Sequence, residues 1–219
     1  MQDLIKQEQF ELEILDKLNS RRLLSGLVFL GGTMLRLCFG LNRFSVDLDF
    51  WVARKIDNKK LFRQLKEILG KDYVIKDSAN KFNTLLFEIR SKDYPRSLKI
   101  EIRKQPKKIK TDTAIAYSKY SNTQVFIKVI SLKDMMSAKI EAFLARKEIR
   151  DIFDLEFLLK KGVALEASAE VSGRMLKEIA ALNRKDYSVK LGSLLEDKER
   201  KYYIAENFKI LKSALEERR

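Results

Sequence analysis

The 219-residue chain contains no histidine and a single cysteine. Without histidine, Ser-His and Cys-His triads, HExxH metalloproteases and histidine-ligated zinc sites are all excluded. The lone cysteine, Cys38, excludes an internal disulfide, and its apolar neighbours indicate a buried structural thiol rather than a nucleophile. Any catalysis must therefore use carboxylates, lysine, hydroxyl groups or a bound metal.

Long apolar segments are also missing. No run approaches the roughly 20 apolar residues that a membrane-spanning helix needs. The N-terminal segment, MQDLIKQEQFELEILDKL, has no uninterrupted apolar core and does not have the pattern of a signal peptide. We therefore expect a cytoplasmic protein without a membrane partner.

Positive charge is in excess. Lysine and arginine number 45 against 31 acidic residues, which gives a formal net charge of +14. A hydrophobic fraction of 45% at this length is enough for a folded core. The surplus charge indicates an acidic partner, with nucleic acid first and an anionic membrane surface second.

A glycine pair lies between an expected strand and an expected helix within residues 28–52, VFLGGTMLRLCFGLNRFSVDLDFWV. Gly31 and Gly32 follow a short apolar run, and Thr33 is expected to be the N-cap of a helix over residues 34–39. Glycines allow close backbone approach, and a helix N-terminus offers free N–H groups to a phosphate. On its own, a glycine pair more often marks only a turn.

Two aspartates follow on an expected second strand. Asp47 and Asp49 share one face of it, and Leu48 and Phe50 share the other. Neighbouring carboxylates repel each other unless a cation lies between them, and Mg²⁺ prefers such oxygen ligands. The alternative is a solvated strand face, but the order of glycine pair, helix and aspartate pair favours nucleotidyl transfer.

Further strands are expected at residues 73–75, 84–90, 98–103 and 124–130, the first of them after a helix capped by Asp57 or Asn58 and ended by Gly70. The 98–103 strand alternates cleanly and places Glu101 on its polar face. A third carboxylate there can serve as a metal ligand or as the base for an attacking hydroxyl. The alternative is an exposed glutamate flanked by two cations.

The basic segment RKQPKKIK follows this strand directly, at residues 103–110. Such a run is often a solvated loop. Because it adjoins the Glu101 strand, we expect RNA phosphate contacts without sequence readout. The expected contacts are Lys104, Lys107, Lys108 and Lys110.

Helices are expected at residues 3–22, from a Ser131 N-cap onward, and at 165–182, 187–197 and 199–217. The Ser131 helix is expected to bend near Glu148. If it were continuous, Lys139 and Asp154 would lie along one of its faces. The alternative interpretation is an ordinary helical ion-pair ladder, in which Arg150 pairs with Asp154.

Two blocks of the sequence resemble the AbiEii-type nucleotidyltransferase toxins of the polymerase-β-like superfamily, which include mycobacterial toxins that modify tRNA. The second block is Lys139 with the later Arg-Asp-x-x-Asp-Leu of residues 150–155. Val46 departs from the acidic residue that family members commonly carry there. The first block comprises Gly31, Gly32, Thr33, Leu35, Arg36, Gly40, Arg43, Phe44, Ser45, Asp47, Leu48, Asp49 and Phe50.

The resemblance implies an α/β (α+β) nucleotidyltransferase fold, a mixed sheet flanked by helices, with a helical C-terminal region. It implies nucleotide binding by Lys139, which would hold the triphosphate, and a positioning role for Asp154. The remaining nucleotide-binding positions that it implies are Gly31, Gly32, Thr33, Arg36 and Ser45. The catalytic set that we expect is Asp47, Asp49, Glu101, Lys139 and Asp154, with the first three as ligands of two Mg²⁺ ions.

We therefore expect residues 1–162 to form the catalytic domain and 163–219 a helical region. The expected activity is transfer of NMP from NTP to the 3′ end of tRNA by a toxin that an antitoxin restrains. The alternatives are transfer to a small molecule or a protein side chain, and a non-catalytic RNA-binding module.

Overall fold

The computed structural model describes residues 1–218, and its contacts divide the chain into two units. The first comprises Met1–Gly40 and Phe44–Ile130. The second comprises Leu41–Arg43 and the chain from Ser131 onward. The boundary expected after residue 162 falls inside the second unit, between two of its helices.

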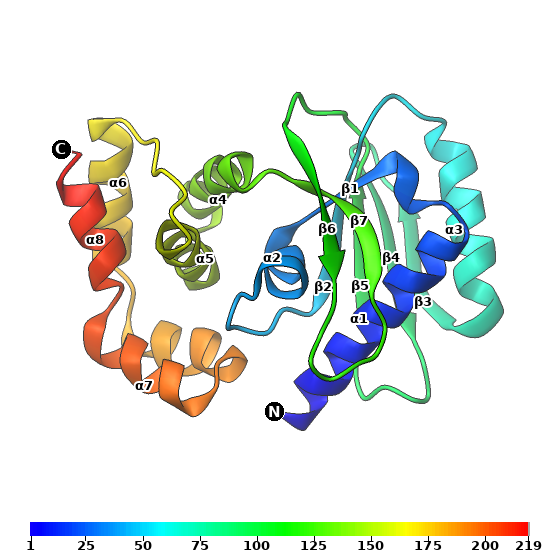
Figure 1. Ribbon diagram of the computed structural model, residues 1–219, viewed down its shortest axis with the longest axis horizontal. Helices are drawn as coiled ribbons and strands as arrows, with labels where there is room; N and C mark the ends of the chain where they lie inside the picture. Colours follow the sequence, from blue (N-terminus) through cyan, green and yellow to red (C-terminus); the bar gives the residue numbers. More distant parts are fainter. Residues whose placement is uncertain (219) are drawn as a thin grey trace. The chain divides into compact units, whose positions relative to one another are not determined.

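A seven-stranded mixed sheet is the centre of the first unit, in the order β3-β4-β5-β2-β1-β7-β6 (Figure 1). The β5–β2 and β1–β7 pairs are parallel, and the other four are antiparallel. The expected mixed sheet with a helical C-terminal region is confirmed. The strands are β1 (Leu27–Leu30), β2 (Asp47–Val52), β3 (Val74–Asn80), β4 (Thr84–Arg90), β5 (Leu98–Arg103), β6 (Thr111–Ala116) and β7 (Val125–Ile130).

Two edge strands differ from the sequence expectation. β3 continues to Asn80 instead of ending at Ile75, and β6 was not expected at all. Most residues of both strands are exposed or half-buried. Because neither strand buries one full face, neither shows the apolar alternation that predicts a strand.

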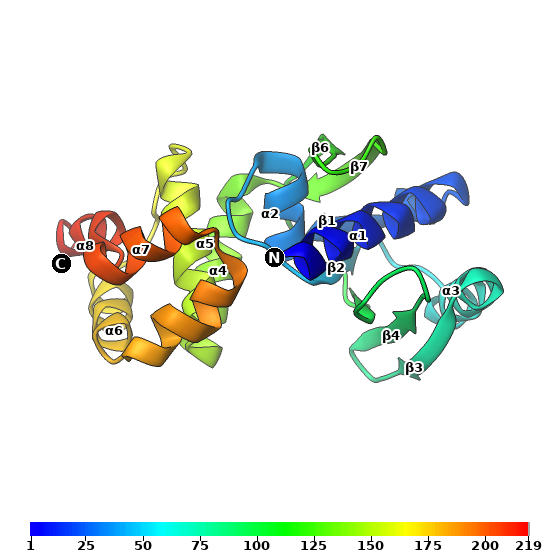
Figure 2. The ribbon, with the colours of Figure 1, turned by 90° about the horizontal axis from the view of Figure 1, so that it is seen from below.

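Three α-helices and a short 3₁₀ turn complete this unit: α1 (Gln2–Ser20), η1 (Leu24–Gly26), α2 (Gly31–Phe39) and α3 (Asn58–Asp72). Asp57 caps α3, since its side chain accepts hydrogen bonds from two backbone N–H groups of the first turn. The expected stop at Gly70 is wrong, because α3 continues to Asp72. Figure 2 shows α1 and α3 as separate helices beside the strands.

The two faces of the central strands differ in polarity. Leu48 and Phe50 on β2 and Ile100 on β5 are fully buried. Phe62 of α3 packs on Phe87 of β4 with ring centres 4.9 Å apart, so α3 covers this apolar face. The opposite face carries the aspartates of β2.

The second unit is helical. Its elements are α4 (Leu132–Arg146), α5 (Ile149–Lys160), α6 (Ala169–Ala180), a π-helical turn η2 (Asp186–Leu191), a 3₁₀ turn η3 (Gly192–Leu194), α7 (Asp197–Glu206) and α8 (Lys209–Glu216). Ser131 caps α4 as expected. The expected bend is a break at Lys147, which has a φ of 56°. The helix expected at 187–197 is wrong, because π and 3₁₀ turns occupy most of that segment.

The core of the second unit includes Tyr203, Phe208, Leu211 and Leu215, all buried. Tyr203 contacts both Phe153 of α5 and Phe208, with ring centres 4.8 and 5.1 Å away. Among residues 1–218, no helix is long and apolar enough to cross a membrane.

Candidate functional site

Asp47 and Asp49 lie half-buried on one face of β2, as expected. The parallel pairing with β5 places Glu101 directly beside Asp49, and Lys99 beside Asp47. Paired residues of adjacent strands project to the same side of a sheet. Three carboxylates and one ammonium therefore share this face.

Gly31 brings the start of α2 against Asp49. Its φ is +88°, a region that glycine adopts without strain. A Cβ at this position would lie 2.7 Å from Asp49 Oδ2, so any side chain there would force Asp49 to shift. The Gly31 backbone is thus fitted to the carboxylate, at the helix end where free N–H groups are concentrated.

The expected N-cap role of Thr33 is wrong. α2 begins at Gly31, and Leu30 is its N-cap residue. The buried Thr33 hydroxyl instead donates a 2.6 Å hydrogen bond to the backbone carbonyl of Asp47. This bond ties the first turn of α2 to the start of β2, so the side chain of Thr33 positions Asp47. Its expected contact with a nucleotide stays a prediction.

Lys99 forms an ion pair with Glu101. The hydrogen bond to Glu101 and the negative charges of Glu101, Asp47 and Asp49 together raise the pKa of Lys99 above its ordinary value, against a smaller effect of burial. All three carboxylates therefore act on one cation. Within residues 1–218 no three metal-ligating side chains already converge on one point, and Glu101 is directed to Lys99.

A fourth carboxyl group, Glu11 of α1, lies fully buried in the same unit. Neither of its oxygens has a hydrogen-bond partner within the described structure. Burial raises the pKa of Glu11 well above 4.5, and the charges of Glu8 and Asp47 raise it further, while Arg36 opposes them. The buried environment therefore favours the protonated, neutral form of Glu11.

The other expected nucleotide-binding residues of this unit are Gly32, Arg36 and Ser45. Gly32 is buried in the first turn of α2, and Ser45 is half-buried just before β2. Arg36 pairs with Glu8 of α1 and packs 3.8 Å from the centre of the Phe44 ring. These contacts account for Arg36 without a ligand, so its nucleotide contact also stays a prediction.

Lys139 and Asp154 meet in a buried charge cluster of the second unit. Lys139 Nζ lies 2.6 Å from Asp154 Oδ2 and 3.0 Å from Asp151 Oδ1. Arg43 donates two 2.7 Å hydrogen bonds to Asp154, and Arg146 donates two 2.6 Å bonds to Asp151. Three cations thus surround two carboxylates.

The cations determine the protonation of this cluster. Burial alone would raise the pKa of Asp154, but Arg43 and Lys139 outweigh it and hold that pKa below its ordinary value. The pKa of Asp151 is lowered in the same way, against burial, by Arg146 and Lys139. Both carboxylates are therefore ionised at neutral pH, and both hold the Lys139 ammonium.

The lysines of the basic segment lie after β5 in a stretch without regular structure. Lys107, Lys108 and Lys110 are exposed. Lys104 is half-buried, and its ammonium hydrogen-bonds the backbone carbonyl of Lys81. Three of the four lysines therefore present their charge to solvent, and the RNA contacts of all four stay predictions.

Sequence reasoning missed Lys99, Arg43 and Asp151 as functional neighbours. The alternation of β5 already placed Lys99 on the face of Glu101, so that signal was present. Nothing local connects Arg43 to Asp154, because their contact depends on the tertiary fold. Asp151 stood inside the quoted Arg-Asp-x-x-Asp-Leu segment, three residues before Asp154, without an assigned partner.

The family comparison decides the class of this protein. A family model described as the nucleotidyl transferase AbiEii toxin of type IV toxin–antitoxin systems matches residues 13–214. The chain belongs to this family. It is therefore a nucleotidyltransferase toxin of a toxin–antitoxin system, and AbiEii membership implies an NTP substrate and an antitoxin partner.

Solved structures share the AbiEii fold at low sequence identity. A putative nucleotidyltransferase from Helicobacter pylori is 21% identical, with a TM-score of 0.56, and the match covers 95% of this chain and 96% of that one. MenT4, a nucleotidyltransferase toxin from Mycobacterium tuberculosis H37Rv, is 15% identical, with a TM-score of 0.63 and coverage of 95% and 84%. Comparison with curated proteins finds no match.

Proposed function

We propose that this toxin transfers NMP from an NTP to the 3′ acceptor end of tRNA in the presence of Mg²⁺, and so blocks translation. The observation that supports this most is the shared face of Asp47 and Asp49, with Gly31 fitted against Asp49 and Glu101 beside it. Backbone approach and paired carboxylates are what a metal-bound triphosphate requires.

The carboxylates of Asp47 and Asp49 share one strand face, and Glu101 is paired beside Asp49. These oxygen donors suit a divalent cation. Asp47, Asp49 and Glu101 would hold Mg²⁺, which would supply positive charge for the phosphate groups of the NTP. As the alternative to its role as a metal ligand, Glu101 released from Lys99 would accept the proton of the attacking hydroxyl.

Lys139 is proposed to bind the triphosphate as a compact point charge. Asp151 and Asp154 hold its ammonium, and Arg43 fixes Asp154 in turn. The positioned lysine therefore loses little side-chain freedom when it binds a phosphate.

The proposed acceptor rests on charge. A single nucleotide does not need a net charge of +14, whereas an RNA backbone uses it. The exposed lysines after β5 add to this, because β5 carries Glu101. A small-molecule or protein acceptor would make little use of this surplus.

Incubation of the protein with total RNA, each labelled NTP and Mg²⁺ tests the reaction. We expect label on the tRNA fraction, and we expect Asp47→Asn and Asp49→Asn each to abolish it while the melting temperature stays near that of wild type. Asp77→Asn, an exposed acidic residue of β3, is the control and should transfer normally. Transfer by Asp47→Asn or Asp49→Asn at the wild-type rate would rule out the carboxylate mechanism.

A salt series tests the acceptor. Replacement of Lys104, Lys107, Lys108 and Lys110 by alanine should raise the apparent KM for tRNA and flatten its dependence on salt, because fewer counterions are released. Nucleotide affinity should change little. Equal salt slopes would exclude this segment from RNA binding, and absence of tRNA binding by wild type at low salt would favour a small-molecule acceptor.

A further inference from the structure

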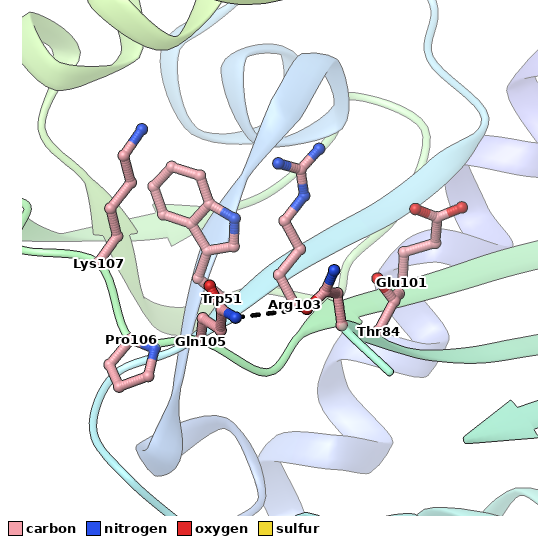
Figure 3. Close-up of a pocket in the computed structure, with 8 residues that line it drawn as sticks. Trp51, Thr84, Glu101, Arg103, Gln105, Pro106 and Lys107 are labelled. Atoms are coloured by element: carbon pink, nitrogen blue, oxygen red, sulfur yellow. Dashed lines mark hydrogen bonds between the residues drawn. The ribbon is translucent and has the colours of Figure 1, made fainter. Parts of the chain in front are cut away.

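A pocket of about 470 Å³ opens beside Glu101 in the first unit, in the size range of small-ligand sites. Its lining includes Trp51, Glu101, Arg103 and Lys107. Figure 3 shows the side chains of these four residues projecting to the same side of the strands. Lys107 is one of the expected RNA contacts, whereas Trp51 and Arg103 have no role in the reaction proposed above.

The sheet register places Trp51 and Arg103, which line this pocket, two residues beyond Asp49 and Glu101 on the same two strands. Asp49 pairs with Glu101, and two residues further on, Trp51 pairs with Arg103. Two residues of a strand span about 7 Å. Trp51 and Arg103 therefore lie on the same face as the carboxylates, next to Glu101.

The chemistry of the lining suits a nucleotide. Trp51 is 5% exposed and contributes an aromatic ring to the lining. Lys107 Nζ lies 5.2 Å from the centre of the indole ring, and Arg103 is exposed. Aromatic surface next to basic side chains is the combination that binds unpaired bases and their phosphates. Gln105, which also lines the pocket, donates a 3.3 Å hydrogen bond to Asn83.

The pocket lies on the other side of β2 from the expected triphosphate site, so the acceptor and the donor nucleotide would bind on different sides of Asp47 and Asp49. Gly31, where the triphosphate is expected, is the first residue of α2 and follows β1, which borders β2 on one side. The pocket adjoins β5, which borders β2 on the other side. Asp47 and Asp49 on β2 thus lie between the donor side and the pocket.

We propose that this pocket binds an unpaired nucleotide of the RNA acceptor, with its base on Trp51 and its phosphate held by Arg103 and Lys107. The inference rests on the proposed function, and it adds the residues that position the reacting end. Lys107 leaves the indole face and pairs with phosphate when the base enters.

Trp51 is the only tryptophan of the chain, so intrinsic fluorescence reports on the pocket directly. An RNA trinucleotide with a free 3′ hydroxyl should quench this fluorescence in a saturable manner, and NTP with Mg²⁺ should not. Quenching by NTP alone would overturn the proposal, because the pocket would then belong to the donor. Absence of quenching by the trinucleotide would overturn it as well.

Variants separate this inference from the proposed function. Arg103→Ala and Lys107→Ala should each raise the KM for tRNA about tenfold and weaken trinucleotide quenching, with the KM for NTP unchanged. Lys66→Ala is the control, since it removes one exposed charge from α3, on the opposite face of the sheet. If both pocket variants match Lys66→Ala while wild type labels tRNA, the pocket proposal fails and the function stands. If wild type labels no RNA and shows no quenching, both fail.

Discussion

Arg43 and Asp154 are 111 positions apart and form a buried two-point ion pair, in which Nε and Nη2 each donate a 2.7 Å hydrogen bond to a separate carboxylate oxygen. Their side chains are 3% and 0% exposed. The same carboxylate lies 2.6 Å from Lys139 Nζ. Arg43 therefore holds the Asp154 carboxylate in place, and this carboxylate in turn holds the Lys139 ammonium.

Arg43→Ala should lower the free energy of unfolding by about 3–5 kcal/mol, because it leaves a buried carboxylate with one cation fewer. Arg43→Lys should restore only part of this, since an ammonium cannot make the parallel two-point contact. Urea unfolding measures both. Arg150→Ala is the control: it removes the cation one helical turn from Asp154, and a loss as large as that of Arg43→Ala would contradict the observed pairing.

Lys139→Ala should reduce nucleotide transfer by on the order of 100-fold, because it removes the charge proposed for the triphosphate. Lys139→Arg should not restore full activity, as guanidinium is larger and planar. Steady-state transfer and NTP affinity are measured below the melting temperature of each variant, which separates nucleotide use from stability. Lys133→Ala, a surface lysine of α4 paired with Glu166, should behave like wild type. Retained NTP affinity and rate in Lys139→Ala would make the lysine purely structural.

The shared face of Asp47, Asp49 and Glu101 could be predicted from the sequence because its determinants are local. Alternation placed Asp47 and Asp49 together, and it placed Glu101 on the polar face of its own strand. The buried cluster could not be predicted, because Arg43 reaches Asp154 only through the tertiary fold. The interpretation of Arg150 and Asp154 as a helical ladder failed for the same reason: Asp154 faces inward, toward Arg43 and Lys139.

Gly31→Ala should impair both stability and transfer. The left-handed φ of +88° costs an alanine about 1–2 kcal/mol, and its Cβ would collide with Asp49 Oδ2. Thermal melting and labelled transfer measure the two effects. Gly26→Ala is the control, since nothing lies within 4 Å of its Cβ position and its φ is not in the left-handed region. A Gly31→Ala protein with wild-type transfer would show that the close approach to Asp49 has no catalytic role.

Glu11→Gln should stabilise the protein at neutral pH and leave it unchanged in acid. The folded pKa of Glu11 is raised above 4.5, chiefly by burial, whereas the unfolded chain releases the proton near that value. The folded state therefore binds more protons, and wild-type stability falls as pH rises from about 4.5 toward the folded pKa. Glutamine has no proton to lose, so the difference in melting temperature between variant and wild type should be near zero below pH 4.5 and grow above it. Glu67→Gln, at an exposed position of α3, should show no such trend. A difference that stays constant with pH would mean that Glu11 is ionised in the folded protein.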